Sequence, residues 1–367
     1  MEDFEEKKYK TAVLLGAGTE SKEDIMRSLV ELERLADTAG IQTLEMCYQS
    51  FKEQTKATYI GSGKVEEVAE VVARVKPDVV IVDEMIKAFQ LRNLSEAFGV
   101  DVIDRYMLVL DIFSQRAKTA EGKLQVEIAQ MKYNISRISM IKEDAQRFKG
   151  GVGSRGPGEK ATEIAKRAYR AKLQGLQEKV DNLKKQRELS RNKRKNNNEK
   201  LVAIVGYTNA GKSTLLNALA KDNIYADDKL FATLDTTTRK IFLDYKHSFL
   251  ITDTVGFISK LPHDLIEAFQ ATLEEASSAN CILNVVDCSD KDALHHIEVT
   301  KNTLQIVGAG DIPVIYVLNK ADKCSDFSAF EGLDYIKVSA KTGENLEKLK
   351  QKIASILFPN YDYVIYE

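Results

Sequence analysis

The stretch LVAIVGYTNAGKSTLLNALA (201–220) decides the fold of the C-terminal half of the chain. Its first six residues form a near-continuous apolar run, which is typical of a buried parallel strand. GYTNAGKST (206–214) then matches the pattern GxxxxGK[ST], and a helix pattern follows it. A chance glycine turn is the alternative, but the strand before the match and the helix after it disfavour that interpretation. The stretch therefore predicts a P-loop that binds nucleotide phosphates.

The residue types in this loop suit phosphate binding. Glycines allow backbone N–H groups to point at the phosphates, and the N-terminal end of the following helix adds a positive dipole. Lys212 is predicted to reach the β- and γ-phosphates and to act in catalysis, and Ser213 is predicted to ligate Mg²⁺. The predicted phosphate-binding residues are Gly206, Asn209, Ala210, Gly211, Lys212, Ser213 and Thr214.

A second motif, ITDTVG (251–256), extends the apolar run SFLIT. Asp253 is predicted to hold Mg²⁺, usually through water, and Gly256 is predicted to act in catalysis by offering its N–H to the γ-phosphate. Many small GTPases carry a glutamine directly after this motif to orient the attacking water, but this chain has Phe257. Because a phenyl ring cannot make those hydrogen bonds, we expect slow intrinsic hydrolysis that a partner accelerates.

Between these two motifs lies a predicted polar loop, DDKLFATLDTTTRK (227–240). A threonine in such a loop can close over the metal when GTP is bound. We choose Thr237 for this catalytic and metal-binding role, with Thr236 and Thr238 as the nearest alternatives. The competing interpretation is a threonine-rich lead-in to a strand.

The motif NKAD (319–322) follows another buried-strand pattern and points to guanine. A carboxylate at Asp322 can accept hydrogen bonds from N1–H and the 2-amino group of guanine, neither of which adenine has. A buried acceptor of this kind rejects an analogue that leaves it unpaired. Asn319 and Lys320 are predicted to brace the loop and stack on the base. VSAKTGENLEKL (338–349) is predicted to add base contacts from Ser339, Ala340 and Lys341.

The N-terminal part, residues 1–115, predicts an α/β domain. TAVLLG (11–16) and DVVIVDE (78–84) are strand patterns, and residues 23–40 form a helix pattern with apolar residues on one face. Further patterns predict strands at 41–49 and 99–105 and a helix opening near Ser62. Strands that alternate with helices predict βαβ units around a mostly parallel sheet.

Residues 116–195 predict an antiparallel helical hairpin. Apolar residues recur every three or four positions in each arm, and the glycine-rich stretch 149–159 separates the arms. The seam positions are Leu124, Ile128, Met131, Ile135 and Ile138 in the first arm and Tyr169, Leu173, Leu176, Val180 and Leu183 in the second. Residues 160–200 carry fourteen Lys or Arg and five Asp or Glu. A solvated helix face is one explanation, but the concentrated charge beside a glycine-rich tip favours contact with a nucleic-acid backbone. Residues 191–200 are predicted to form a solvated linker.

Composition sets the remaining expectations. The 367 residues are too many for one typical core, and the net charge of −2 gives no overall attraction to polyanions. The four cysteines form no CxxC pair, which favours reduced thiols over a zinc site or disulfides. No apolar run is long enough to span a bilayer. We expect a monomeric, cytoplasmic protein, with a transient membrane association left open.

Together the nucleotide motifs match the P-loop GTPase domain of the TRAFAC class, assigned to residues 196–358 and followed by a short tail, 359–367. DRYMLVLDIFSQRAKTAEGKLQVEIAQMKY (104–133), GSRGPGE (153–159) and the GTPase segments FATLDTTTR and DTVGFISKLPHDLIEAFQATLEE closely resemble the HflX family of GTPases. The resemblance implies GTP or GDP and Mg²⁺ as cofactors. It also implies binding to the large (50S) ribosomal subunit and its rRNA, and a role in splitting or rescuing stalled ribosomes under stress.

The chain departs from the family pattern in three places. One lies before QLRNL (90–94), where the family usually has a serine-proline turn and this chain has IKAF. Many members have a proline in the switch loop where this chain has Thr236, and this alignment supports Thr237 as the switch threonine. Some members carry a further C-terminal domain, whereas about ten residues follow the last predicted helix here.

Two functions therefore compete. The first is a ribosome-coupled GTPase whose nucleotide controls its affinity for the subunit. The second is a nucleotide-gated RNA-binding or ribosome-assembly factor in which hydrolysis is incidental.

Overall fold

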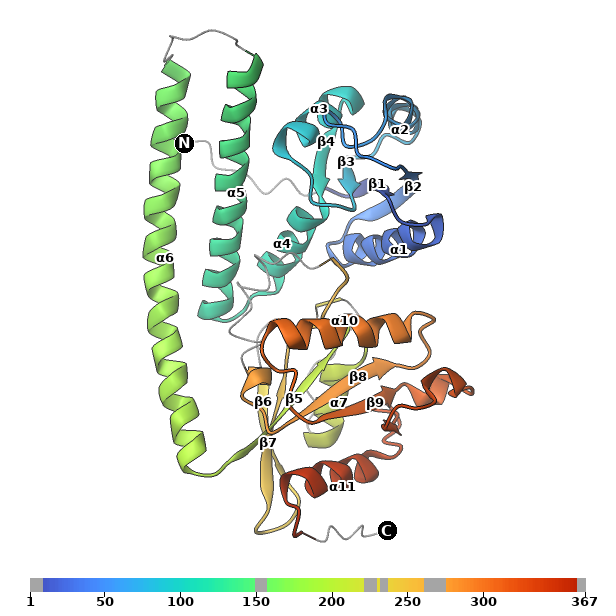
Figure 1. Cartoon of the computed structure of the whole chain (residues 1–367), viewed down its shortest axis with the longest axis vertical. Helices are drawn as coiled ribbons and strands as arrows, with labels where there is room; N and C mark the ends of the chain where they lie inside the picture. Colours follow the sequence, from blue (N-terminus) through green and yellow to red (C-terminus); the bar gives the residue numbers. More distant parts are fainter. Residues whose placement is uncertain (1–8, 149–156, 221–229, 232–236, 261–274, 362–367) are drawn as a thin grey trace. The chain divides into compact units, whose positions relative to one another are not determined.

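The structure is a computed structural model that describes residues 9–148, 157–220, 230–231, 237–260 and 275–361 (Figure 1). The chain divides into two compact units. The N-terminal unit comprises Met1–Gln115 and Val126–Lys179, and the C-terminal unit comprises Arg116–Gln125 and Val180–Glu367. Each unit is built around its own sheet, as the α/β prediction requires.

The N-terminal unit contains a four-stranded parallel sheet in the order β2-β1-β3-β4. Its strands are β1 (Thr11–Gly18), β2 (Gln42–Ser50), β3 (Val79–Val82) and β4 (Asp101–Asp104). Its helices are α1 (Lys22–Thr38), α2 (Ser62–Val75), α3 (Ala88–Phe98) and α4 (Arg105–Arg116). The four predicted strands and the helices at 23–40 and near Ser62 are confirmed.

Two helices of this sheet, α3 and α4, were not predicted. Helix α4 begins at Arg105, the residue after the last residue of β4, so no turn residue marks the change from strand to helix. The Asp104 carboxylate instead caps the helix by accepting a hydrogen bond from the Met107 N–H at 2.9 Å. The sequence pattern did not reveal this boundary, because neither Gly nor Pro separates the strand from the helix.

A buried ion network fastens α1, β3 and α4 together. Arg105 donates to Asp83 and to Glu31, each at 2.7 Å, and the arginine and aspartate side chains are almost fully buried. Burial alone disfavours the arginine charge, but the two carboxylates outweigh it and raise the pKa of Arg105. Removing one partner would leave a buried charge uncompensated, so this network makes the packing of α4 specific.

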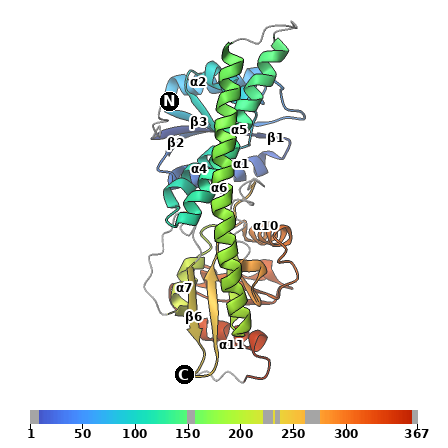
Figure 2. The same cartoon turned by 90° about the vertical axis from the view of Figure 1, so that its left-hand side faces the viewer.

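The predicted helical hairpin consists of α5 (Ala120–Phe148) and α6 (Pro157–Asn196), which lie side by side in Figure 1, with α6 in front of α5 in the view of Figure 2. Salt bridges from Arg187 to Glu121 and from Lys172 to Glu127 show that the helices run antiparallel. The buried seam positions are Ile128, Met131, Leu176 and Val180. Leu124, Ile135, Tyr169, Leu173 and Leu183 are half-buried. The side chain of Ile138 and residues 149–156 of the predicted tip lie outside the described part of the chain.

The predicted linker at 191–200 is wrong over most of its length, because α6 continues to Asn196. Its charged residues suit a helix as well as a solvated coil, and composition alone does not distinguish the two. Arg194 is held by Glu275 at 3.1 Å, which adds a tertiary contact to the end of this helix.

The C-terminal unit contains a six-stranded sheet in the order β10-β9-β8-β5-β7-β6. Its strands are β5 (Lys200–Gly206), β6 (Thr237–Phe242), β7 (Ser248–Asp253), β8 (Cys281–Asp287), β9 (Val314–Asn319) and β10 (Tyr335–Lys337). Strand β6 pairs antiparallel with β7, and the other pairs are parallel. This sheet, mixed and mostly parallel, confirms the predicted fold class.

Helices cover both faces of this sheet, as expected. Helices α7 (Lys212–Ala220) and α11 (Leu346–Leu357) pack on one face, in the hydrophobic cluster that contains Val202 and Ile204. Helix α10 (Ala293–Ile306) packs on the other face, in the cluster that contains Ala203 and Val205. Two short 3₁₀ turns, η1 (Ala321–Lys323) and η2 (Ser328–Phe330), follow β9. All four cysteines are free thiols.

Candidate nucleotide-binding site

The loop after β5 has the backbone shape of a phosphate cradle. Gly206 has a φ of +146°, and a Cβ at this position would lie 2.2 Å from the Val285 carbonyl oxygen. Gly211 has a φ of +90°, and a Cβ there would lie 2.3 Å from Nδ2 of Asn319. Only glycine fits both positions, so the backbone itself can approach a ligand closely.

Lys212 begins α7 and is 7% exposed. Its ammonium donates to the carbonyl oxygen of Tyr207 at 2.8 Å, which holds it beneath the loop. Burial lowers the pKa of Lys212 to about 8, and the charge of Asp253 partly opposes this shift. Negative phosphates beside this ammonium would favour its charged form, so the lysine is poised to respond to a ligand.

The structure brings the predicted metal-binding residues together. The Ser213 hydroxyl donates to the Asp253 carboxylate at 2.7 Å. Thr237 begins β6 and lies directly opposite Asp253 in the antiparallel ladder. Two hydroxyls and a carboxylate are oxygen ligands of the kind that Mg²⁺ takes, so the side chains present fit this ion.

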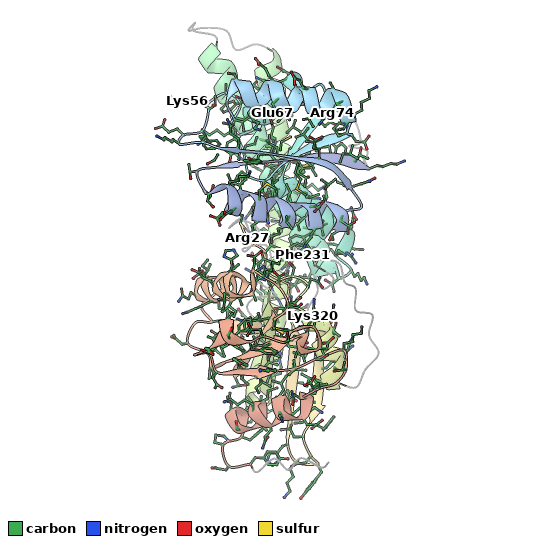
Figure 3. All side chains as sticks on the ribbon, turned by 90° about the vertical axis from the view of Figure 1, so that its right-hand side faces the viewer. Arg27, Lys56, Glu67, Arg74, Phe231 and Lys320 are labelled. Atoms are coloured by element: carbon green, nitrogen blue, oxygen red, sulfur yellow. The ribbon has the colours of Figure 1, made fainter. Side chains whose placement is uncertain are left out.

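The predicted polar loop at 227–240 is wrong in both of its described pieces, 230–231 and 237–240. Residues 237–240 belong to strand β6, so the alternative interpretation of a strand lead-in is right for that stretch. Leu230 is buried at 6% exposure, and Phe231, labelled in Figure 3, is buried at 2% exposure. Residues 227–229 and 232–236, including Thr236, lie outside the described part of the chain. The closure of Thr237 over a metal stays a prediction.

The DTVG turn is fixed against the P-loop. The Phe257 N–H donates to the Gly206 carbonyl at 3.1 Å, and the Thr208 N–H donates to the Phe257 carbonyl at 2.8 Å. A Cβ on Gly256 would lie 2.8 Å from Nζ of Lys212. The Phe257 ring is 2% exposed and packs in the core cluster with Val205. The turn therefore places the backbone of Gly256 beside Lys212, while the side chain of Phe257 packs in the core.

Four residues near this turn were missed by sequence reasoning. The Tyr207 hydroxyl accepts from the Ser259 N–H at 2.8 Å and shares a hydrogen bond of 2.7 Å with the Ser259 hydroxyl. The Ser259 hydroxyl lies 3.4 Å from Nε2 of His295, and the His296 ring stacks on Tyr207 at 3.8 Å. The sequence places the two histidines far from Tyr207, and they match no metal-site spacing, so no local pattern signals this contact.

Asn319 braces the site, as predicted. Its Nδ2 donates to the Ala210 carbonyl at 2.9 Å, and its Oδ1 accepts from the Ala340 N–H at 3.0 Å. One amide thus joins the phosphate loop to the loop predicted to contact the base. Lys320, labelled in Figure 3, has a φ of +61° and pairs with Asp287 at 2.7 Å.

Asp322 lies at the surface, so its description as a buried acceptor needs correction. One carboxylate oxygen accepts from the Ser339 hydroxyl at 2.6 Å, and this hydrogen bond holds the pKa of Asp322 below its usual range. The carboxylate is therefore charged at neutral pH and oriented by Ser339, while Lys341 beside it is exposed. Burial of the acceptor would have to come from a bound base.

The residues present also fit a nucleotide. The buried Thr208 hydroxyl, in the middle of the P-loop, has no hydrogen-bond partner among the described residues. Buried hydroxyls rarely stay unpaired in native proteins. Asn209 in the same loop is exposed and has a φ of +59°. The loop therefore combines a glycine cradle, a buried lysine and an unsatisfied hydroxyl, as a phosphate site requires.

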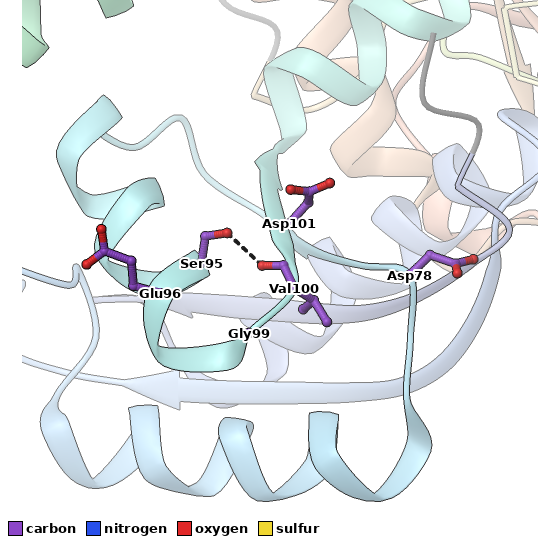
Figure 4. A pocket seen from close by; sticks show the side chains of 6 residues that line it. All are labelled: Asp78, Ser95, Glu96, Gly99, Val100 and Asp101. Carbon is purple, nitrogen blue, oxygen red and sulfur yellow. Dashed lines mark hydrogen bonds between the residues drawn. The ribbon is translucent and has the colours of Figure 1, made fainter. Parts of the chain in front are cut away.

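An open depression of about 520 Å³ in the N-terminal unit is a different kind of feature (Figure 4). It lies at the amino-terminal ends of β3 and β4, whereas ligands of open parallel sheets bind beyond the carboxyl ends. Asp78 accepts hydrogen bonds from the N–H groups of Lys10 and Thr11, and the Tyr9 hydroxyl donates to Asp101. These carboxylates fasten the start of β1, so the depression is structural.

No cluster of His, Cys, Asp and Glu could hold a metal by itself within the described ranges. Among the same residues, no helix has both the length and the apolar character that crossing a membrane demands.

Comparison with known proteins agrees with this geometry. Three family models match the chain: a GTP-binding GTPase N-terminal region at residues 26–114, a GTP-binding GTPase middle region at 116–194, and a 50S ribosome-binding GTPase at 201–320. The crystal structure of an SsGBP–GDP complex is 25% identical, with a TM-score of 0.52, and the match covers 95% of this chain and 99% of that one.

Curated relatives extend the match over nearly the whole chain. The GTPase HflX of Caldanaerobacter subterraneus subsp. tengcongensis is 44% identical over 355 residues, which cover 97% of this chain and 82% of the relative. The GTPase HflX of Escherichia coli K12 is 40% identical over 338 residues, which cover 90% of this chain and 79% of the relative. The P-loop, the DTVG turn and the NKAD loop lie at the carboxyl ends of β5, β7 and β9, and this chain belongs to the HflX family of GTPases.

Proposed function

We propose that this GTPase binds the large ribosomal subunit and its rRNA, and that it couples GTP binding and hydrolysis to the splitting, rescue or recycling of ribosomes under stress. The observation that carries the proposal is the contact between Arg194 and Glu275. Arg194 lies near the end of the basic helix α6 and donates to both carboxylate oxygens of Glu275, at 3.1 and 3.3 Å. Glu275 comes after the DTVG turn in the sequence, and we propose that its pair with Arg194 links nucleotide-dependent changes in the GTPase domain to α6.

Electrostatics supports an RNA partner. Residues 160–200 carry a net charge of +9, whereas the whole chain carries −2. Arg167, Arg170 and Lys172 are exposed on α6. Helix α6 ends at Asn196, and β5, which leads into the P-loop, begins at Lys200. Phosphate contacts by such a helix supply affinity that falls steeply with salt.

The site residues have separate roles in the proposed hydrolysis. Lys212 would neutralise charge on the β- and γ-phosphates, and the Gly256 N–H would donate to the γ-phosphate. Ser213, Asp253 and Thr237 would hold Mg²⁺, which when bound supplies further positive charge between the phosphates. Because Phe257 offers no hydrogen bond to water, intrinsic turnover is slow and ribosome binding accelerates it.

Guanine selection follows from the NKAD loop. Asp322 would accept the two donors of the guanine edge, and Lys320 would cover the ring. Asn319 would keep this loop in register with the phosphate loop through its hydrogen bonds to Ala210 and Ala340. Ser339 orients the Asp322 carboxylate, and Lys341 adds a neighbouring positive charge. We further propose that the protein acts as a cytoplasmic monomer.

The proposal is tested by co-sedimentation with separated ribosomal subunits, in GDP and in a non-hydrolysable GTP analogue. The expected result is nucleotide-dependent binding to the large subunit and subunit-stimulated hydrolysis. Arg194→Ala should keep subunit binding and lose most of the stimulation. Lys185→Ala, which removes an exposed charge from the same helix, should weaken binding but retain stimulation at saturation. Equal stimulation of the wild type and Arg194→Ala would refute the coupling.

The second candidate is a nucleotide-gated RNA-binding or assembly factor in which hydrolysis is incidental. The buried Phe257 favours it, because it stands at the position where many small GTPases carry the glutamine that orients water. A hydrolysis-deficient variant separates the two functions. If the variant splits ribosomes once and fails to recycle, hydrolysis is part of the function. If recycling is unaffected, the second candidate stands.

A further inference from the structure

The β6–β7 hairpin carries an unusual surface. Among the described residues, the large hydrophobic side chains that are mostly exposed include two aromatics, and both lie on this hairpin: Phe242 at 69% and Tyr245 at 89% exposure. Strand β6 is at the edge of the sheet. Thr238, Lys240 and Phe242 are exposed at alternate positions, so they share one face of the strand.

Each exposed ring has a lysine beside it. The ammonium of Lys240 lies 5.8 Å from the Phe242 ring centroid, and that of Lys246 lies 5.3 Å from the Tyr245 ring centroid. Exposed aromatic faces next to cations are the elements that bind unpaired nucleotides: bases stack on the rings and phosphates meet the cations. A protein partner would need an apolar surface around the rings, whereas the nearest neighbours here are lysines, of which Lys240 also lies 3.9 Å from the Glu199 carboxylate.

Hydrogen bonds and ring contacts hold the tip of the hairpin, which lowers the entropy cost of presenting these rings. Asp244 accepts hydrogen bonds from the N–H groups of Lys246 and His247, both at 2.6 Å. The His247 ring also contacts Asp244 and holds the pKa of that carboxyl well below its usual range. His247 packs against Phe358 and Tyr361, at centroid distances of 5.2 and 4.2 Å. The acidic residue in the turn is thus occupied by the turn itself.

We propose that Phe242 and Tyr245, with Lys240 and Lys246, form a second RNA-binding surface that takes single-stranded, unstacked nucleotides. The inference deepens the proposed ribosome association and rests on it. The same strand begins at Thr237, opposite Asp253. RNA bound at the tip would therefore favour one arrangement of the strand that carries the predicted switch threonine.

Photocrosslinking tests the proposal and separates this surface from α6. The full-length protein is irradiated with a short oligouridylate that contains thiouridine. After trypsin, both rings lie in one peptide, residues 241–246, because cleavage occurs after Lys240 and after Lys246. The expected crosslink is on this peptide. Phe242→Ala with Tyr245→Ala should abolish it and weaken oligouridylate binding at least about fivefold, the loss of one stacked base.

Matched variants control for general effects. Leu294→Ala with Ile306→Ala removes two exposed apolar side chains from α10 and should change neither readout. Phe242→Trp with Tyr245→Trp should restore binding. Crosslinks confined to residues 160–200, or unchanged affinity in the double alanine variant, would overturn the proposal, as would self-association through the hairpin. If the protein sediments with the large subunit but the hairpin is not crosslinked, this inference alone fails. If it does not sediment at all, the proposed function fails.

Discussion

The two sheets of this molecule begin with the same order of elements, but the N-terminal turns of their first helices differ in charge. Each starts with a buried parallel strand, a glycine-containing turn and a helix. In the C-terminal unit, α7 begins at Lys212, and no acidic residue lies in its first turn. In the N-terminal unit, the first turn of α1 carries Glu23 and Asp24, and the Ser21 hydroxyl already accepts the Asp24 N–H. One helix end is open to anions, and the other is satisfied by its own side chains.

The same contrast holds for the buried cations. Lys212 donates to a single backbone carbonyl and has a lowered pKa, so it gains from a negative ligand. Arg105 is already paired with two carboxylates at 2.7 Å, so it has nothing to gain. The comparison teaches that the parallel topology sets only the position of a site. The charge left unpaired at the first turn decides whether phosphates bind there.

The largest expected effect is on nucleotide binding. Lys212→Ala should weaken GTP binding by roughly 100- to 1,000-fold, because removing one partner of a buried charge contact costs several kcal/mol. Lys22→Ala, at the first position of α1, is the matched control and should leave affinity unchanged. Fluorescent-GDP titration measures both. Strong residual binding in Lys212→Ala would mean that the N-terminal sheet holds nucleotide. The contrast between the two helix ends would then be wrong.

The Arg105 network should dominate the stability of the N-terminal unit. Arg105→Met leaves two carboxylates unpaired and should cost about 3–5 kcal/mol of unfolding free energy. Arg74→Met removes an exposed pair with Glu45 and should cost about 1 kcal/mol or less. Urea unfolding of both variants gives the difference. Similar losses would show that the two ion pairs do not differ as their burial suggests.

Base selection depends on one carboxylate. Asp322→Ala should weaken GTP binding roughly 10- to 150-fold, the value of hydrogen bonds to a charged group, and should affect ATP far less. Asp326→Ala removes a nearby exposed carboxylate that accepts a hydrogen bond from the Ser328 N–H, and base preference should be unchanged. Competition between GTP, inosine triphosphate and ATP measures the change. An unaltered preference for GTP over ATP in Asp322→Ala would refute the role of Asp322 in guanine selection.

The pH dependence of binding follows from Lys212. Its pKa of about 8 means that the ammonium loses its proton above pH 8 in the absence of phosphate. Phosphates favour the charged form, so binding takes up a proton, and affinity should fall about tenfold per pH unit above pH 8. Calorimetry in buffers of different ionisation enthalpy detects the proton. A flat affinity between pH 7 and about 9 would contradict the lowered pKa.

The smallest expected effect concerns Tyr207. Tyr207→Phe keeps the ring on His296 but removes both hydrogen bonds to Ser259. We expect kcat to fall about three- to tenfold, because the two bonds at about 0.5 kcal/mol each contribute about 1 kcal/mol together, with KM and GDP affinity unchanged. Tyr335→Phe is the control. A change in KM alone would assign Tyr207 to nucleotide binding instead of to positioning the DTVG turn.

Sequence patterns predicted most of the sheets and the seam of the helical hairpin. They failed where no turn residue marks a boundary, as between Asp104 and Arg105, and where charged composition suggested coil, as before Asn196. They also described Asp322 as buried, since the pattern gives a residue type and not its depth. Thr237 was placed in a loop because threonine suits both a loop and an edge strand.

By itself, the sequence determined the phosphate loop, because two glycines, a lysine and a serine at fixed spacing act through local backbone geometry. It also determined the guanine motif and the family. Only the tertiary structure decided which distant residues meet. The contacts of Tyr207 with Ser259 and His296, of Arg194 with Glu275, and of Asn319 with two loops join positions far apart in the chain. Such contacts depend on how strands and helices pack, and no local spacing encodes them.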